Sequence, residues 1–101
     1  MHAELLKKIQ DRAATVGVIG MGYVGLPLAA RAASLGFPVI GFDVSAERVA
    51  QLNRGESYIG DVPSALLADL RAAGTIEATT DTARMAACDL LIICVPTPLN
   101  Q

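Results

Sequence analysis

The stretch VGVIGMGYVGLPLA, residues 16–29, contains three closely spaced glycines between a β-branched apolar segment and a segment rich in Ala and Leu. These glycines are Gly20, Gly22 and Gly25. Glycine is unfavourable inside regular structure, so three of them at one junction indicate a backbone conformation or a close approach that side chains would prevent. We therefore expect a strand to end here, a tight turn to follow, and a helix to begin at once.

The rest of the chain continues this alternation of strands and helices. Apolar segments predict four strands, at residues 15–19, 38–42, 76–79 and 89–95. Helical patterns predict helices at residues 4–12, 23–35, 45–53 and 63–73, with a shorter helical turn over 81–85. Strands that alternate with helices form parallel sheets with right-handed crossovers. The predicted fold is therefore α/β, the first half of a Rossmann-type parallel sheet, with four strands in the order 3-2-1-4 and helices on both faces.

The composition excludes several classes of function. The chain has 101 residues, enough for one small domain, and a net charge of −2 with 18% charged residues. It therefore lacks the basic surface by which proteins bind nucleic acids or anionic membranes. No apolar run reaches the roughly 20 residues of a membrane-spanning helix, and the charged residues 1–12 lack the apolar core of a signal peptide. We expect a soluble, cytoplasmic protein.

The spacing Gly20-x-Gly22-x-x-Gly25 matches the dinucleotide-binding fingerprint, and its place between a predicted strand and a predicted helix strengthens the match. Gly20 would allow the tight turn, Gly22 the approach of the cofactor pyrophosphate to the backbone, and Gly25 close packing of helix and strand. The helix N-terminus would offer unpaired N–H groups and a partial positive charge to the phosphates. The alternative interpretation is a tight strand-to-helix turn without a ligand.

Two charged residues complete the predicted cofactor site. Asp43 lies 18 residues after Gly25, at the end of the second predicted strand. Its carboxylate would accept hydrogen bonds from the ribose hydroxyls and repel a 2′-phosphate, which favours NAD over NADP. Alternatively, Asp43 helps to cap the helix that begins near Ser45. Arg48, one turn into that helix, could cover the adenine or ribose, or could be a solvated surface residue.

Three segments resemble a known family. GMGYVGLPLA, GFDV and ICVPTPLN are similar to the N-terminal part of the UDP-glucose/GDP-mannose dehydrogenase family of nucleotide-sugar dehydrogenases, and the resemblance covers residues 5–100. The segments LLKKIQDRAATVGVIG and GESYIGDVPS most resemble the UDP-N-acetylglucosamine 6-dehydrogenase branch. The resemblance implies oxidation of a primary alcohol on a UDP-sugar to a carboxylate, with two NAD molecules as hydride acceptors and a thioester on a catalytic cysteine.

The resemblance also implies roles for individual residues. Those expected at the cofactor are Gly20, Gly22, Tyr23, Val24 and Gly25 at the pyrophosphate, Asp43 at the ribose, Arg48 at the adenosine end, and Val95, Pro96 and Thr97 at the sheet edge. The VPTP segment could instead be only a rigid exit from the fourth strand. No catalytic or metal-binding residue is expected within this chain.

Family members are several times longer, and their catalytic cysteine belongs to a segment beyond residue 101. Cys88 and Cys94 match neither that motif nor a CxxC or zinc pattern, and we expect both to be reduced, buried thiols. Residues 1–101 are thus expected to form the N-terminal part of a dinucleotide-binding domain, without the substrate domain and without catalysis of its own.

Two rival functions remain open. A hydroxyacid or hydroxyacyl-CoA dehydrogenase would share the layout, although it should lack VPTP and carry other residues after the second glycine. A non-catalytic Rossmann module would bind a nucleotide or only a partner protein. The strand at residues 90–95 should form an exposed apolar edge, which predicts a homo-oligomer or aggregation through that edge.

Overall fold

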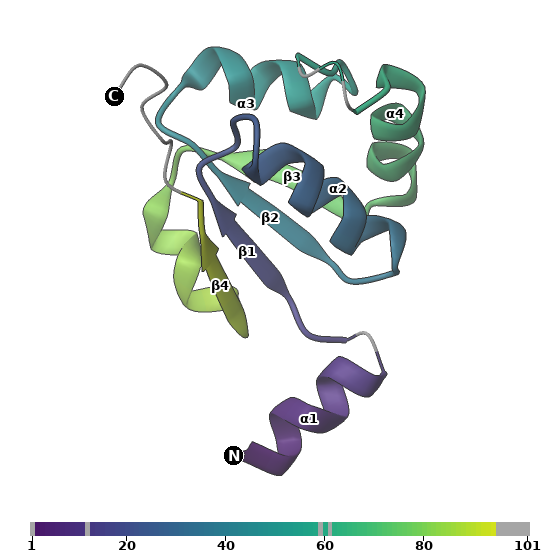
Figure 1. Ribbon diagram of the computed structural model, residues 1–101. Helices are drawn as coiled ribbons and strands as arrows, with labels where there is room; N and C mark the ends of the chain where they lie inside the picture. The colour runs from purple at the N-terminus through teal and green to yellow at the C-terminus, as the bar shows by residue number, and fades with distance from the viewer. Residues whose placement is uncertain (1, 12, 59, 61, 95–101) are drawn as a thin grey trace, which may run out of the picture.

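The computed structural model describes residues 2–11, 13–58, 60 and 62–94. Its strands are β1 (Val16–Ile19), β2 (Val39–Phe42), β3 (Ile76–Thr79) and β4 (Leu90–Ile93). Its helices are α1 (His2–Gln10), α2 (Gly25–Ser34), α3 (Ala46–Asn53) and α4 (Ser64–Ala73), with the 3₁₀-helix η1 (Thr82–Ala87) before β4 (Figure 1). Each of these elements overlaps one that the sequence predicts.

The four strands form one parallel sheet in the order β3-β2-β1-β4, which confirms the predicted topology. In the register of the sheet, Val16 of β1 lies between Val39 of β2 and Leu90 of β4. The carboxyl end of β1 is therefore flanked by the carboxyl ends of β2 and β4. Ligands of open α/β sheets bind at this edge, and the glycine-rich turn follows β1 there.

Helices cover the two faces of the sheet unequally. On one face α2 lies across the strands, with α4 beside it (Figure 1). Val18 of β1, Leu26 and Ala29 of α2, and Leu67 of α4 are all fully buried in the core between these elements. Small residues on α2 let the helix approach the sheet closely. The other face carries η1, so helices lie on both faces, as predicted.

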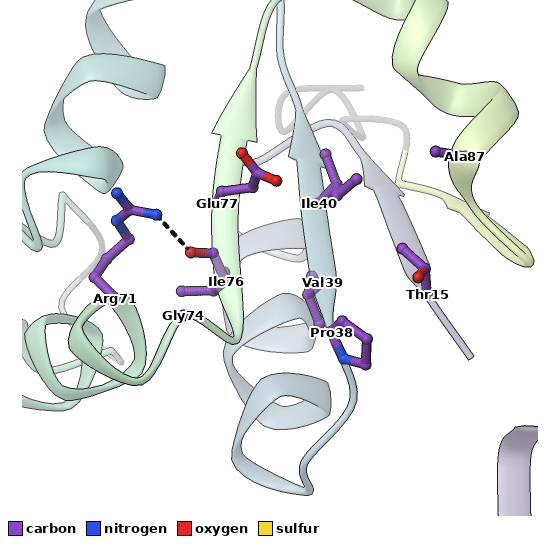
Figure 2. Close-up of a pocket in the computed structure, with 9 residues that line it drawn as sticks. All are labelled: Thr15, Pro38, Val39, Ile40, Arg71, Gly74, Ile76, Glu77 and Ala87. Carbon is purple, nitrogen blue, oxygen red and sulfur yellow. Dashed lines mark hydrogen bonds between the residues drawn. The ribbon is translucent and has the colours of Figure 1, made fainter. Parts of the chain in front are cut away.

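The second face has a hollow of about 430 Å³ beside η1. It runs from Thr15 and Pro38, at the starts of β1 and β2, to Gly74 before β3. Figure 2 shows Glu77 and Ile40 on this face, with Ala87 of η1 to one side. The hollow therefore lies at the amino ends of the strands, away from the glycine-rich turn.

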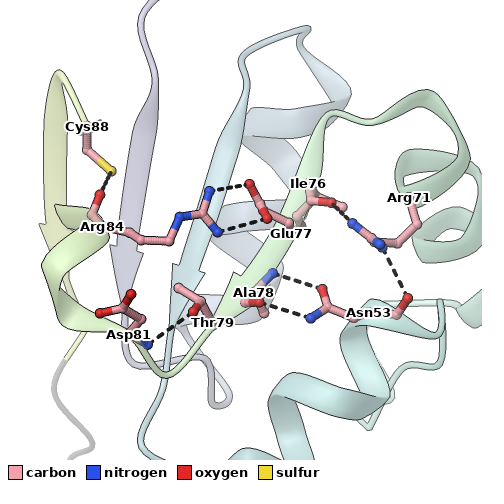
Figure 3. A network of polar contacts seen from close by, with 9 residues as sticks. All are labelled: Asn53, Arg71, Ile76, Glu77, Ala78, Thr79, Asp81, Arg84 and Cys88. Atoms are coloured by element: carbon pink, nitrogen blue, oxygen red, sulfur yellow. Dashed lines mark hydrogen bonds and ion pairs between the residues drawn. The ribbon is translucent and has the colours of Figure 1, made fainter. Parts of the chain in front are cut away.

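The outer edge of β3 is sealed by side chains (Figure 3). The Asn53 amide donates to the Ala78 carbonyl at 2.9 Å and accepts from the Ala78 N–H at 3.0 Å. The Arg71 guanidinium donates to the Ile76 carbonyl at 2.9 Å. These side chains replace the hydrogen bonds of a neighbouring strand, so this edge is blocked against pairing with another chain.

The opposite edge strand, β4, is exposed, as predicted. Leu91, Ile92 and Ile93 are 47%, 37% and 67% exposed.

The prediction that both cysteines are buried is wrong: Cys88 and Cys94 are free thiols, but each is only partly buried. The reason is that they flank β4, which among the described strands has a neighbour on one side only.

Several helices differ from the prediction in their bounds or type. The first, expected from residue 4, begins at His2. The helix expected from residue 23 begins at Gly25, because Tyr23 and Val24 still belong to the turn and Val24 is the N-cap. The helix expected after Asp81 is a 3₁₀-helix, whose first turn is capped where the Asp81 carboxylate accepts from the Ala83 N–H at 3.0 Å. Among the described residues, no helix has the length and apolar character needed to cross a bilayer.

Candidate cofactor site at the glycine turn

The glycine turn, residues 20–25, connects β1 to α2 and leaves no space for side chains at two of its glycines. Gly20 has a φ of 91°, in the left-handed region that favours glycine, and a Cβ there would collide with the Cys94 carbonyl oxygen. A Cβ on Gly25 would collide with the Gly20 carbonyl oxygen. The turn is therefore tight at Gly20, and α2 starts against the end of β1 because Gly25 has no side chain.

Gly22 has a different environment from the other two glycines. Within the described structure, and apart from its own chain neighbours, the only atom within 4 Å of a Cβ built there is Arg48 Nη1, at 3.6 Å. Close packing therefore does not explain why position 22 is a glycine. The need for an open backbone surface does. The absence of a side chain here leaves a cradle over which an extended anionic group could contact the main chain.

The N-terminus of α2 faces this cradle. Among the described residues, no side chain caps the helix, and Tyr23 and Val24 are 81% and 65% exposed. An uncapped helix start presents N–H groups and a partial positive charge. The turn and the helix start together fit the pyrophosphate of a dinucleotide.

Asp43 connects the turn to the second strand. Its carboxylate follows β2, is only 7% exposed, and accepts from the Met21 N–H at 2.9 Å and the Ser45 N–H at 2.8 Å. Ser45 itself is the N-cap of α3, accepting from the Arg48 N–H at 3.2 Å. Asp43 therefore supports the start of α3 but is not its cap. Each carboxylate oxygen can accept more than one hydrogen bond, so acceptor capacity for ribose hydroxyls remains.

Arg48 is held over the turn instead of extending freely into solvent. Its Nη1 lies 3.6 Å from Asp43 Oδ2, and its guanidinium carbon lies 5.7 Å from the centroid of the Tyr58 ring. The side chain is 45% exposed. Arg48 therefore lies beside both the Asp43 carboxylate and Gly22.

Tyr58 is the residue at this site that the sequence analysis did not find. Its hydroxyl donates to the Met21 carbonyl at 2.7 Å, although the residues are 37 positions apart. Burial, and then the negative charge of Asp43, raise the pKa of Tyr58 to about 12, while the positive charge of Arg48 opposes this shift. The sequence signal was an aromatic residue in GESYIGDVPS, a segment used above for the branch resemblance and assigned no role at the site.

The structure thus brings Gly20, Gly22, Gly25, Asp43 and Arg48 together at one edge of the sheet, with the Tyr23 and Val24 side chains turned to solvent. Val95, Pro96 and Thr97 lie outside the described residues. The Cys94 N–H donates to the Ile19 carbonyl at 2.8 Å, so the last described residue lies beside the turn. No cluster of three or more His, Cys, Asp or Glu side chains that could hold a metal occurs in the described part of the chain.

Residues 14–101 match the UDP-glucose/GDP-mannose dehydrogenase family, NAD binding domain. The chain belongs to this family. The resemblance seen in the sequence is therefore confirmed, and NAD is the cofactor of the domain family. The family match argues against the hydroxyacid and hydroxyacyl-CoA dehydrogenases as alternatives.

Several relatives illustrate the family. The chain is 33% identical to the UDP-N-acetyl-D-mannosamine dehydrogenase of Pyrococcus horikoshii, over 84% of this chain and 21% of the relative. It is 35% identical to the UDP-N-acetyl-D-glucosamine 6-dehydrogenase of Pseudomonas aeruginosa, over 85% of this chain and 19% of the relative. A solved ternary complex of GDP-mannose dehydrogenase from Pseudomonas aeruginosa superposes with a TM-score of 0.75 at 37% identity, over 82% of this chain and 20% of the solved chain. The chain thus spans about a fifth of the length of these dehydrogenases.

Proposed function

We propose that this chain binds NAD at the glycine turn, as the cofactor-binding part of a nucleotide-sugar 6-dehydrogenase. The observation that carries the proposal is the junction of two features at one sheet edge. The open backbone at Gly22 lies before the uncapped start of α2, and the largely buried Asp43 carboxylate is hydrogen-bonded to the same turn through the Met21 N–H. One feature suits a pyrophosphate and the other suits a ribose.

The proposal assigns a task to each group. Gly20 and Gly25 shape the turn, while Gly22 and the start of α2 receive the pyrophosphate. Asp43 accepts hydrogen bonds from the ribose hydroxyls, and its charge disfavours a 2′-phosphate. Arg48 covers the adenosine end. Val95, Pro96 and Thr97 stay predicted cofactor contacts.

The proposed activity of the whole protein is oxidation of the C6 alcohol of a UDP-N-acetylhexosamine or UDP-glucose to a carboxylate. NAD supplies the hydride acceptor in each of two steps. Named relatives act on both UDP-N-acetylmannosamine and UDP-N-acetylglucosamine, so the predicted glucosamine branch is one of two supported choices. Homo-oligomerisation, a cytoplasmic location and a role in polysaccharide biosynthesis belong to the same proposal.

A binding experiment on the chain tests the proposal. Titration calorimetry with NAD and, separately, NADP should show binding of NAD only. Asp43→Ala and Gly22→Val should abolish it, whereas Asp69→Ala, on the exposed side of α4, should leave it unchanged. A folded chain that binds neither nucleotide would contradict the proposal. It would favour the second candidate, a non-catalytic interaction module, for which the exposed apolar strand β4 is the supporting observation.

A further inference from the structure

Tyr58 contacts two parts of the proposed cofactor site at once. Its hydroxyl donates to the Met21 carbonyl of the glycine turn, and its ring lies against the Arg48 guanidinium. We propose that Tyr58 is a positioning residue for NAD: its hydroxyl orients the Met21–Gly22 peptide and its ring holds Arg48 over the turn. This inference rests on the proposed function, because it concerns the same site.

The loop that carries Tyr58 is fixed from both neighbouring helices. The Glu56 N–H donates to the Gln51 carbonyl of α3 at 3.0 Å, and the Ser57 N–H donates to the Ser64 hydroxyl at the start of α4 at 3.0 Å. The buried Gly55 packs so closely on α4 that a Cβ there would lie 2.9 Å from the Ala68 Cα. The position of Tyr58 is therefore set by the scaffold before any ligand binds.

Met21, the partner of Tyr58, is held on three sides. Its side chain is 1% exposed and fills the space that Gly41 of β2 leaves free, since a Cβ on Gly41 would lie 2.5 Å from Met21 Cε. Its N–H donates to Asp43, and its carbonyl accepts from Tyr58. The Tyr58 hydroxyl is thus the contact that fixes the carbonyl side of this residue.

The Met21 carbonyl and the Gly22 N–H belong to one peptide group. Because a trans peptide is planar, its C=O and N–H point in opposite directions. Fixing the carbonyl toward Tyr58 therefore fixes the direction of the Gly22 N–H, one of the backbone donors of the cradle. Without the hydroxyl, this peptide could rotate, and the donor would have to be reoriented each time the pyrophosphate binds.

The ring of Tyr58 acts on Arg48. A guanidinium over an aromatic face is attracted by the ring quadrupole. Arg48 also lies 3.6 Å from Asp43 Oδ2 and 3.6 Å from the position of a Cβ on Gly22. The Tyr58 ring and the Asp43 carboxylate together hold the positive charge of Arg48 over the place proposed for the anionic cofactor. An arginine without these contacts would extend into solvent. Tyr58 also packs against the core, so a test must separate positioning from simple packing.

The test compares six variants of the chain with the unaltered protein. Tyr58→Phe removes the hydroxyl and keeps the ring, and Tyr58→Leu removes both. Arg48→Gln is made alone and together with each. Thr75→Val is the matched control, because it removes a hydroxyl-to-carbonyl hydrogen bond (Thr75 to Leu70, 3.3 Å) at the opposite end of the sheet. Calorimetry measures the Kd for NAD, and NMR relaxation without NAD measures the order parameter of the Gly22 amide.

We expect Tyr58→Phe to weaken NAD binding about fivefold, the effect of losing one hydrogen bond, and to lower the order parameter of the Gly22 amide. Tyr58→Leu should weaken NAD binding about threefold more than Tyr58→Phe, because the aromatic ring that holds Arg48 is also lost. In the Arg48→Gln background, the Tyr58→Phe and Tyr58→Leu variants should bind NAD equally. Thr75→Val should bind NAD like the unaltered chain.

Each contrary result overturns a distinct claim. Unchanged NAD affinity and an unchanged order parameter of the Gly22 amide in Tyr58→Phe would overturn the positioning role while the proposed function stands. Absence of NAD binding by the unaltered chain would overturn the proposed function, and an unchanged Gly22 order parameter in Tyr58→Phe would then still refute the role of Tyr58. If Tyr58→Phe does not fold, the unaltered chain decides: a slowly exchanging Tyr58 hydroxyl proton supports the inference, and a rapidly exchanging one overturns it.

Discussion

The Asp43 carboxylate accepts a hydrogen bond from the Met21 N–H at 2.9 Å, and this contact joins the end of β2 to the glycine turn after β1. A second bond, from the Ser45 N–H, joins the same carboxylate to the start of α3. One side chain therefore aligns the three segments that surround the proposed ribose position. Its loss should affect both folding and cofactor binding.

Asp43→Asn tests this double role. An asparagine keeps the shape but has one acceptor oxygen, so one of the two backbone N–H groups loses its partner. We expect the free energy of unfolding to fall by about 1.5–3 kcal/mol. We also expect discrimination against NADP to weaken, because the negative charge is gone and Arg48 remains. Urea denaturation and paired titrations with NAD and NADP measure the two effects; unchanged discrimination would refute the role of the charge.

Gly25→Ala tests the close contact between α2 and β1. A methyl group at this position would collide with the Gly20 carbonyl, which is backbone and can move only with the turn. We expect a loss of about 2–3 kcal/mol in the free energy of unfolding, together with loss of NAD binding. Gly60→Ala is the matched control, since a Cβ there meets no described atom within 4 Å. Equal stability of both variants would contradict this account.

Alkaline titration should reveal the environment of Tyr58. Its pKa is raised to about 12 from 10.0, so the folded state keeps this proton at a pH where the unfolded state has lost it. The resulting stabilisation is complete below pH 10 and is lost as pH rises from 10 to 12. In a spectrophotometric titration of phenolate, Tyr58→Phe should remove a phase with a midpoint near 12. A midpoint near 10 for that phase would show that the hydroxyl is not buried against Met21.

An ion pair on the second face of the sheet should contribute to acid stability. Arg84 of η1 donates two hydrogen bonds to Glu77 of β3, at 2.7 and 3.0 Å (Figure 3). These bonds lower the pKa of Glu77. The stabilisation is therefore present above the ordinary glutamate pKa of the unfolded chain and is lost as pH falls through the lower folded value. Glu77→Gln should lower the melting temperature at pH 7 and not at pH 2, where Glu77 is protonated and the ion pair is lost. The effect at pH 7 should be small, because both side chains are about 40% exposed.

The apolar edge at β4 predicts self-association. Ile93 is 67% exposed on the unsealed side of the sheet, where strand pairing with another copy is possible. Sedimentation velocity should therefore show concentration-dependent association, which Ile93→Lys reduces. Leu66→Lys, on exposed α4, replaces a comparable surface residue and should leave association unchanged. A monomer at all concentrations would contradict the prediction.

Local sequence patterns determined much of this protein. Alternation of apolar strands with helices predicted the parallel sheet and its order, and the spacing of Gly20, Gly22 and Gly25 predicted the turn. The same logic placed Asp43 beside that turn, because the carboxyl ends of adjacent parallel strands meet at one edge. These features follow from short-range periodicity and from general rules of chain topology.

The tertiary structure decided the contacts between distant segments. Tyr58 reaches Met21 only because the loop before α4 packs between two helices, and Asn53 seals Ala78 only because α3 ends beside β3. The exposure of Cys88 and Cys94 likewise depends on their place beside an edge strand. Such contacts join residues tens of positions apart, and their geometry is set by the packing of whole elements. A local pattern carries no information on that packing. The sequence therefore predicted where the proposed cofactor site lies, while the fold revealed what holds it in shape.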